Sequence, residues 1–205
     1  MKNKFIKLLG LTPLTLAPIA IAASCNTTSE NSEDKKVLEE KEIAGTNIKI
    51  VPYKGTVEEK ALPEGWTYST ETNLSSINKE EFAFEPASGQ SFANDKLIST
   101  KGKENSYDIF LSSFQGTNTV YGKSESTKPF EGINLGTFKG TTFNFTTATN
   151  PIYTNSKGLQ NASGYATVIE NTEGRTIKVL VRLFNFKSKQ ISKSVYELTL
   201  THVTV

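Results

Sequence analysis

The segment 177–186, IKVLVRLFNF, is apolar at every position except Lys178, Arg182 and Asn185. An extended strand with this pattern is apolar on both faces, so it must lie in the interior of a sheet. It forms the second arm of a hairpin pattern over residues 164–186. We expect the intervening turn, 171–174, to be a type I turn closed by a left-handed Gly174. A central strand requires partners on both edges, so the surrounding chain must supply further strands.

The rest of the chain from residue 46 onward supplies them. Strand patterns rich in β-branched and aromatic residues recur between turn residues, as in TNIKIVPY, NSYDIFLSSF and LGTFKGTTFNF, where Lys139-Gly140 predicts a hairpin tip. The last, SVYELTLTHVTV, places Tyr196, Leu198, Leu200 and His202 on one face. We predict an all-β fold, an antiparallel β-sandwich or barrel-like domain over 46–205, with at most one short helix at 75–82.

The first 24 residues have a different composition. They carry three lysines and no acidic residue, and residues 8–23 are apolar apart from two threonines and are broken by Pro13 and Pro18. A basic start, a short apolar stretch and small residues before a break are typical of a secretory signal peptide. The apolar stretch is shorter than the roughly 20 residues of a membrane span. Residues 1–24 are therefore predicted to be removed on export.

Cys25 is the only cysteine in the chain and follows this segment directly, in the sequence Ala22-Ala23-Ser24-Cys25. The stretch resembles a bacterial lipobox, and with the lysine-rich start it is similar to the surface lipoproteins of mycoplasmas. The resemblance implies that the Cys25 thiol receives a diacylglyceryl group and that cleavage occurs just before it. It also implies a protein anchored by acyl chains on the outer face of the cell membrane.

Residues 25–45 are predicted to be the lipidated N-terminus and a flexible tether, because they contain too few apolar side chains to form a core. A short charged helix is the alternative for this segment. Removal of residues 1–24 lowers the formal net charge from +2 to −1. A nearly neutral chain gives no strong indication of nucleic-acid binding.

The composition also restricts the chemistry. Once Cys25 is acylated, the mature chain has one histidine and no free cysteine. A Cys/His nucleophile pair and a Cys/His zinc site are therefore excluded, and we expect no metal and no cofactor. His202 is expected to be structural. The acidic pairs 58–59 and 80–81 fit either a concealed glycosidase or, as we expect, solvated loop charges. The protein is predicted not to be an enzyme.

Two groups of residues are candidate binding sites. Lys187, Lys189 and Lys193 belong to a basic stretch, 175–193, that contains no acidic residue. They could bind an anionic glycan, nucleic acid or lipid headgroups, unless neighbouring strands supply acidic partners. Trp66 and Tyr68 lie in a segment rich in turn residues, where the tryptophan is either a recognition anchor or a plug at one end of the core.

We therefore expect a lipid-anchored surface protein whose β-domain is a binding, adhesion or antigenic module for a host macromolecule or an anionic glycan. Many of the surface lipoproteins that the N-terminus resembles have such roles. A ligand-capture accessory of a transporter is an alternative, although the chain shows no alternating strand and helix pattern. A membrane-anchored hydrolase is a further alternative.

Overall fold

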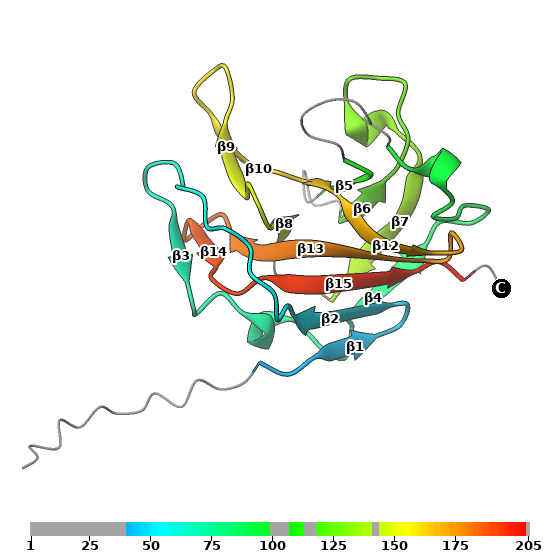
Figure 1. Ribbon diagram of the computed structural model, residues 1–205, viewed down its shortest axis with the longest axis horizontal. Coiled ribbons are helices and arrows are strands. Elements are labelled where there is room, and N and C mark those ends of the chain that lie inside the picture. Colours follow the sequence, from blue (N-terminus) through cyan, green and yellow to red (C-terminus); the bar gives the residue numbers. More distant parts are fainter. Residues whose placement is uncertain (1–39, 99–106, 113–117, 141–143, 204–205) are drawn as a thin grey trace, which may run out of the picture. The chain divides into compact units, whose positions relative to one another are not determined.

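The computed structural model describes residues 40–98, 107–112, 118–140 and 144–203. These residues form an all-β domain in which strands account for nearly all regular structure (Figure 1), as predicted. In the described residues the helical elements are single 3-10 turns. They are η1 (Leu74–Ser76), η2 (Asn94–Lys96) and η4 (Pro129–Glu131).

Two sheets and a separate hairpin make up the domain. The first sheet contains, in spatial order, β1 (Ile43–Gly45), β2 (Ile48–Pro52), β15 (Tyr196–Thr201), β13 (Thr176–Asn185), β14 (Gln190–Ser192) and β3 (Thr67–Ser69), while β12 (Val168–Thr172) and β8 (Asn144–Thr147) also pair with β13. The second contains β11 (Tyr165–Ala166), β5 (Ile109–Ser112), β6 (Thr119–Tyr121), β7 (Asn134–Lys139) and β4 (Ala83–Pro86). The hairpin is β9 (Ile152–Thr154) and β10 (Gln160–Ala162).

The central position predicted for residues 177–186 is confirmed. Val179 lies between Leu198 of β15 and Val168 of β12, and Phe184 lies between Ile191 of β14 and Asn144 of β8. The strand β13 therefore has two partners on each edge, one after the other along its length. Figure 1 shows it crossing the domain as its longest strand.

The two sheets are joined at both sides. Strands β11 and β12 belong to different sheets but are separated only by Thr167, so one stretch of chain passes from the second sheet to the first. On the other side, the Phe84 N–H of β4 donates a hydrogen bond of 2.9 Å to the carbonyl of Thr46, in the turn between β1 and β2. This arrangement gives the domain its barrel-like character.

The core lies between the sheets. It includes the alternate residues of β15 that were predicted to face inward, since Tyr196, Leu198 and Leu200 are fully buried and His202 nearly so. From the second sheet come Phe84, Leu135 and neighbouring aromatic side chains. No described cysteine contributes, and apolar packing holds the sheets together.

Four sequence-based expectations need correction. Residues 134–147 do not form a hairpin about Lys139-Gly140, because β7 pairs with β6 and β4 whereas β8 pairs with β13 in the other sheet. The helix expected at 75–82 is reduced to the single turn η1, which begins after Asn73, whose side chain accepts a hydrogen bond from Ser75 N. Successive strands with similar patterns do not reveal which sheet each will join.

The third correction concerns the turn before β13. Both Glu173 and Gly174 have positive φ, 51° and 70°, and the Arg175 N–H donates to the carbonyl of Thr172. This is a type I′ turn, whose twist suits a tight hairpin better than the expected type I turn. The left-handed glycine was predicted correctly.

The folded part of the chain also begins before residue 46. Ile43 in β1 is buried, and β1 pairs along its length with β2. Residues 43–45, assigned from the sequence to the tether, are thus a strand of the domain. Cys25 and the signal segment lie outside the described residues.

Candidate functional site

A pocket of about 430 Å³ opens between the second sheet, the β9–β10 hairpin and the end of β13. The chain brings together segments that are far apart in sequence to form it. Its lining residues are Phe110, Leu111, Phe130, Asn144, Phe145, Tyr153, Gln160, Asn161, Ala162, Gly164, Tyr165, Phe184 and Phe186. More than half of these are aromatic, and none of them carries an ionisable acid or base other than the tyrosine phenols.

Three aromatic rings at the pocket are unusually exposed. Phe186 is 53% exposed, Phe130 48% and Tyr153 41%. They make up half of the large apolar side chains that are exposed in the described residues. Large apolar groups held in water at one place, around a concave surface, are a common property of binding sites.

One wall of the pocket is formed by Tyr165 in β11. Its ring packs edge-on against Phe110, with centroids 5.0 Å apart, and lies 4.8 Å from the ring of Tyr107. Burial raises the pKa of Tyr165, and the nearby phenols of Tyr153 and Tyr107 raise it further. The Tyr165 hydroxyl is therefore uncharged at neutral pH.

Phe186 also lines the pocket, and its ring packs against that of Trp66. The two rings meet edge to face at 5.5 Å, and Trp66 also lies 6.5 Å from Phe184. The indole N–H of Trp66 donates a hydrogen bond of 2.9 Å to Oε1 of Gln160, and Nε2 of Gln160 donates to the carbonyl of Glu64. Two lining residues, Phe186 and Gln160, are thereby held by one buried indole.

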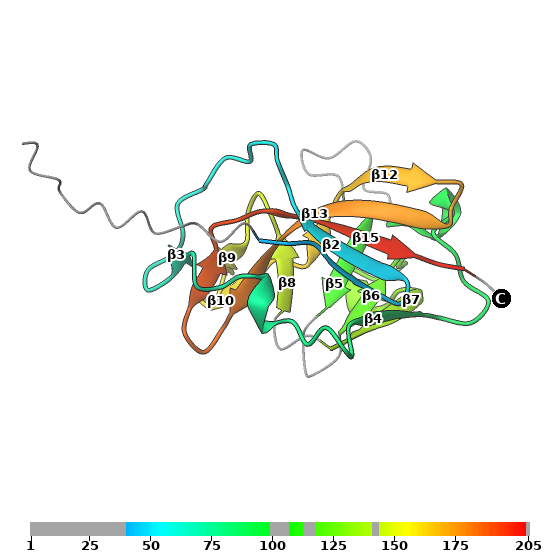
Figure 2. The same cartoon turned by 90° about the horizontal axis from the view of Figure 1, so that it is seen from below.

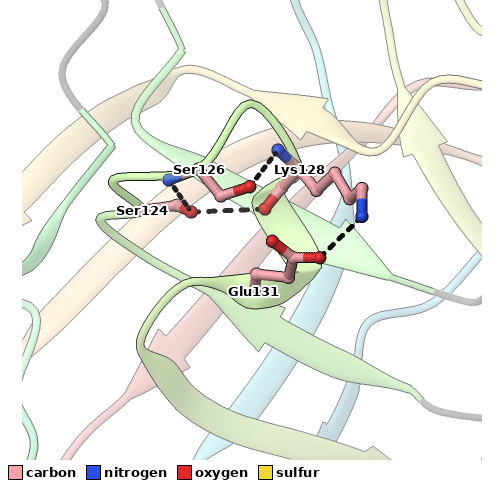
Figure 3. A network of polar contacts seen from close by, with 4 residues as sticks. All are labelled: Ser124, Ser126, Lys128 and Glu131. Atoms are coloured by element: carbon pink, nitrogen blue, oxygen red, sulfur yellow. Dashed lines mark hydrogen bonds and ion pairs between the residues drawn. The ribbon is translucent and has the colours of Figure 1, made fainter.

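Phe130 is carried by an ordered loop between β6 and β7 (Figure 3). Ser124 Oγ donates to the carbonyl of Lys128, the Ser126 N–H donates to Ser124 Oγ, and the Lys128 N–H donates to Ser126 Oγ. Lys128 Nζ pairs with Glu131 at 2.9 Å. Hydrogen bonds from Ser126 and Lys128 lower the pKa of Glu131. These contacts fix the turn on which Phe130 is displayed.

Tyr153 is carried by the β9–β10 hairpin, which lies at the same end of the domain as β3 and β14 (Figures 1 and 2). The buried hydroxyl of Thr146 bonds to the carbonyls of Pro151 and Ser163, the residues that flank the hairpin. At the tip, the side chain of Asn155 accepts hydrogen bonds from two backbone N–H groups. Base and tip are therefore both held by hydrogen bonds within the chain.

Uncharged polar atoms are placed among the rings. The amide of Asn144 forms no side-chain hydrogen bond with any other described residue, and Asn161 donates to the carbonyl of Leu159, leaving its oxygen without a described donor. The site therefore offers aromatic faces, amide groups and phenol hydroxyls. Such a set can bind a ligand through apolar contact and hydrogen bonds.

Trp66 and Tyr68, proposed from the sequence, do not line the pocket. Trp66 is only 6% exposed and forms a second apolar cluster with Ile152, Phe184 and Ile191, which is the plug alternative. The Tyr68 ring lies under the Arg182 guanidinium, 4.9 Å away, and its hydroxyl donates to the carbonyl of Lys60. Both side chains lie beside the pocket as supports.

The basic stretch divides into two groups. Arg182 is 1% exposed and donates to the carbonyls of Ala148, Ser192 and Lys193; burial lowers its pKa. Lys178 pairs with Glu170 at 2.9 Å and with Glu197 at 3.7 Å, so neighbouring strands do supply acidic partners there.

Lys187, Lys189 and Lys193 belong to the other group. They are exposed near β14 and form no ion pair with any described residue, but none of them lines the pocket.

The residues considered for catalysis are dispersed. His202 is buried against the ring of Phe92, with centroids 5.4 Å apart, and neither ring nitrogen has a hydrogen-bond partner in the described structure. The acidic residues 58–59 and 80–81 are exposed, as expected. Among the described residues no group of three His, Cys, Asp or Glu side chains could hold a metal ion.

The pocket residues themselves escaped sequence analysis. Phe110, Tyr153 and Tyr165 are single aromatic residues on different strands and Phe186 lies in the turn after β13, so only the three-dimensional pairing gathers them. One signal was available, because Phe186 continues an apolar strand directly into the exposed turn before Lys187.

The fold and the site define an all-β domain that carries an aromatic pocket on one end. The chain belongs to the Mycoplasma P30 protein family, whose model matches residues 54–201. That match covers most of the described domain and is in accord with the mycoplasma-type character inferred from the N-terminus. No curated protein and no solved structure matches the chain. In the part of the chain that the structure describes, no helix is long and apolar enough to cross a membrane.

Proposed function

We propose that this protein is a lipid-anchored surface protein whose β-domain binds a ligand outside the cell without transforming it. The observation that carries the proposal is the pocket lined by Phe186, Tyr153 and Phe130, three aromatic rings that remain exposed in an otherwise well-packed domain. Membership of a mycoplasma family supports the surface location.

The anchor is the Cys25 thiol in the lipobox-like segment. A double acyl chain gives stable attachment to a membrane, whereas a single chain gives only marginal binding. The protein should therefore partition into the detergent phase after phase separation and incorporate labelled palmitate in its native cells. Cys25→Ser should abolish the labelling and block the cleavage before residue 25. Retention of the label in that variant would show that Cys25 is not the anchor.

The binding role follows from the cost of leaving aromatic rings in water. Burying such a ring is worth roughly 1.5–3 kcal/mol, and the domain leaves three of them open around one concavity. Loops and hairpins that are already ordered around these rings reduce the entropy lost when a ligand binds. Rigid aromatic side chains at the rim of a pocket are the residues that most often dominate a binding interface.

Adhesion of coated beads tests this role. Beads carrying the full chain should bind to host epithelial cells, and beads carrying Phe186→Ala should bind at least about tenfold less if the pocket is a binding hot spot. Ile169→Ala is the matched control, because Ile169 is similarly exposed at 51% but does not line the pocket. Equal adhesion by all three proteins would contradict the proposal.

A further inference from the structure

The chemistry of the pocket lining points to the class of ligand. We infer that the pocket binds an uncharged sugar ring of a glycan, stacked on Phe186 and Tyr153 and hydrogen-bonded by the amides of Asn144 and Asn161. This inference rests on the proposed binding function and adds the identity of what is bound.

The aromatic rings supply the first part of the argument. A pyranose ring has one face of C–H groups that is apolar and nearly flat, and this face packs well on an aromatic ring. Phe186, Tyr153 and Phe130 each present an exposed ring at the pocket. The volume of about 430 Å³ is at the small end of ligand sites. It suits one or two sugar rings rather than a protein segment with bulky side chains.

The polar groups supply the second part. The edge of a sugar ring carries hydroxyl groups, each of which is both a donor and an acceptor. The pocket offers matching groups of both kinds, in the unpartnered amide of Asn144, the oxygen of Asn161 and the hydroxyls of Tyr153 and Tyr165. An acyl chain or a purely apolar peptide surface would leave these groups desolvated without partners, which is costly.

The lack of charged side chains in the described pocket lining favours neutral sugars over acidic ones as ligands. No described lining residue is a carboxylate, lysine or arginine. A carboxylate or sulfate buried against these rings would lose its hydration and find no cation. The free lysines, Lys187, Lys189 and Lys193, are not part of the lining. The anionic glycan expected from the sequence therefore suits this pocket less well than a neutral one.

The test is a glycan array of neutral and acidic oligosaccharides probed with the full chain carrying Cys25→Ser, which removes the proposed acyl chains. Four further proteins, each in the same background, are compared: Phe186→Ala, Asn144→Ala, Ile169→Ala and the triple variant Lys187→Ala, Lys189→Ala, Lys193→Ala. Circular dichroism of each variant confirms that it is folded.

We expect binding to neutral glycans that persists in high salt. Phe186→Ala and Asn144→Ala should each weaken it by about tenfold or more, while Ile169→Ala and the triple lysine variant should bind like the parent chain. Binding only to acidic glycans, lost in salt and in the triple lysine variant, would overturn the inference. So would an array without any binding. If the array shows no binding but beads still adhere to cells in a way that depends on Phe186, the pocket binds another ligand and only the inference of a sugar fails. If the beads do not adhere either, the proposed function fails as well.

Discussion

The indole N–H of Trp66 donates a hydrogen bond of 2.9 Å to Oε1 of Gln160, which lies 94 residues further along the chain. The bond ties the segment before β3 to the β9–β10 hairpin, and Gln160 in turn holds the carbonyl of Glu64. Because Gln160 lines the pocket and Trp66 does not, the bond makes Trp66 a positioning residue for the site.

Trp66→Phe should loosen this wall of the pocket. The variant keeps an aromatic ring in the cluster but leaves Oε1 of Gln160 without its donor, and a lost hydrogen bond of this kind costs about 0.5–1.5 kcal/mol. Urea denaturation measures the loss. In a double-mutant cycle with Gln160→Leu, the two substitutions should couple, since they remove the same bond. Strict additivity would show that the bond contributes nothing.

Leu200 and Thr199 are neighbours on β15 with opposite environments. Leu200 is fully buried, whereas Thr199 is partly exposed. Leu200→Ala should therefore cost about 2–5 kcal/mol, a typical penalty for a cavity in the core. Thr199→Ala should cost much less. Chemical denaturation of both variants compares them directly, and equal losses would mean that both faces of β15 are buried.

Arg182 and Lys178 lie on the same strand but should respond differently to removal of their charge. Arg182→Met removes the donor from the buried carbonyls of Ala148 and Ser192 and from the partly buried carbonyl of Lys193. We therefore expect a loss of at least about 2 kcal/mol that salt does not change. Lys178→Met breaks ion pairs that are exposed to solvent, so the loss of stability should be far smaller. High salt screens these pairs in the parent protein, so the difference between parent and variant should then disappear. Thermal unfolding at low and high ionic strength measures both. A mild effect of Arg182→Met would show that water can replace the guanidinium.

His202 should make the domain less stable in mild acid. Burial lowers its pKa from the ordinary value of 6.5. Below pH 6.5 the unfolded chain binds a proton that the folded chain resists, so stability present at pH 7.5 is lost progressively as the pH falls through 6.5 and toward the folded pKa. His202→Gln should flatten the curve of unfolding free energy between about pH 7 and pH 5.5. If the unfolding free energy of the variant falls with pH as steeply as that of the parent, groups other than His202 cause the acid sensitivity.

Several features of the fold could be predicted because they depend on local pattern. Residues 177–186 are apolar on both faces, and this alone places β13 at the centre of a sheet. The alternation of Tyr196, Leu198 and Leu200 likewise predicts the buried face of β15. Pairing between distant strands is different, since nothing local to residues 134–147 shows that β7 and β8 belong to separate sheets.

The site was harder to predict for the same reason. Trp66 was recognised as notable, yet its contribution is to support Phe186 and Gln160, and that relationship exists only once β10 and β13 are brought beside it. The exposed lysines were visible in the sequence because charge runs are local. An aromatic pocket assembled from single residues on separate strands has no comparable local pattern.

Trp66 provides the most direct measurement of the central claim, that the pocket binds an uncharged sugar. It is the only tryptophan in the chain, and it contacts three residues that line the pocket, Gln160, Phe184 and Phe186. The full chain carrying Cys25→Ser should show a saturable change in tryptophan fluorescence when titrated with methyl glycosides of neutral hexoses and N-acetylhexosamines. The change should persist in Ile169→Ala and disappear in Phe186→Ala. No response to any of these glycosides up to their solubility limits, or an unaltered response in Phe186→Ala, would contradict the claim.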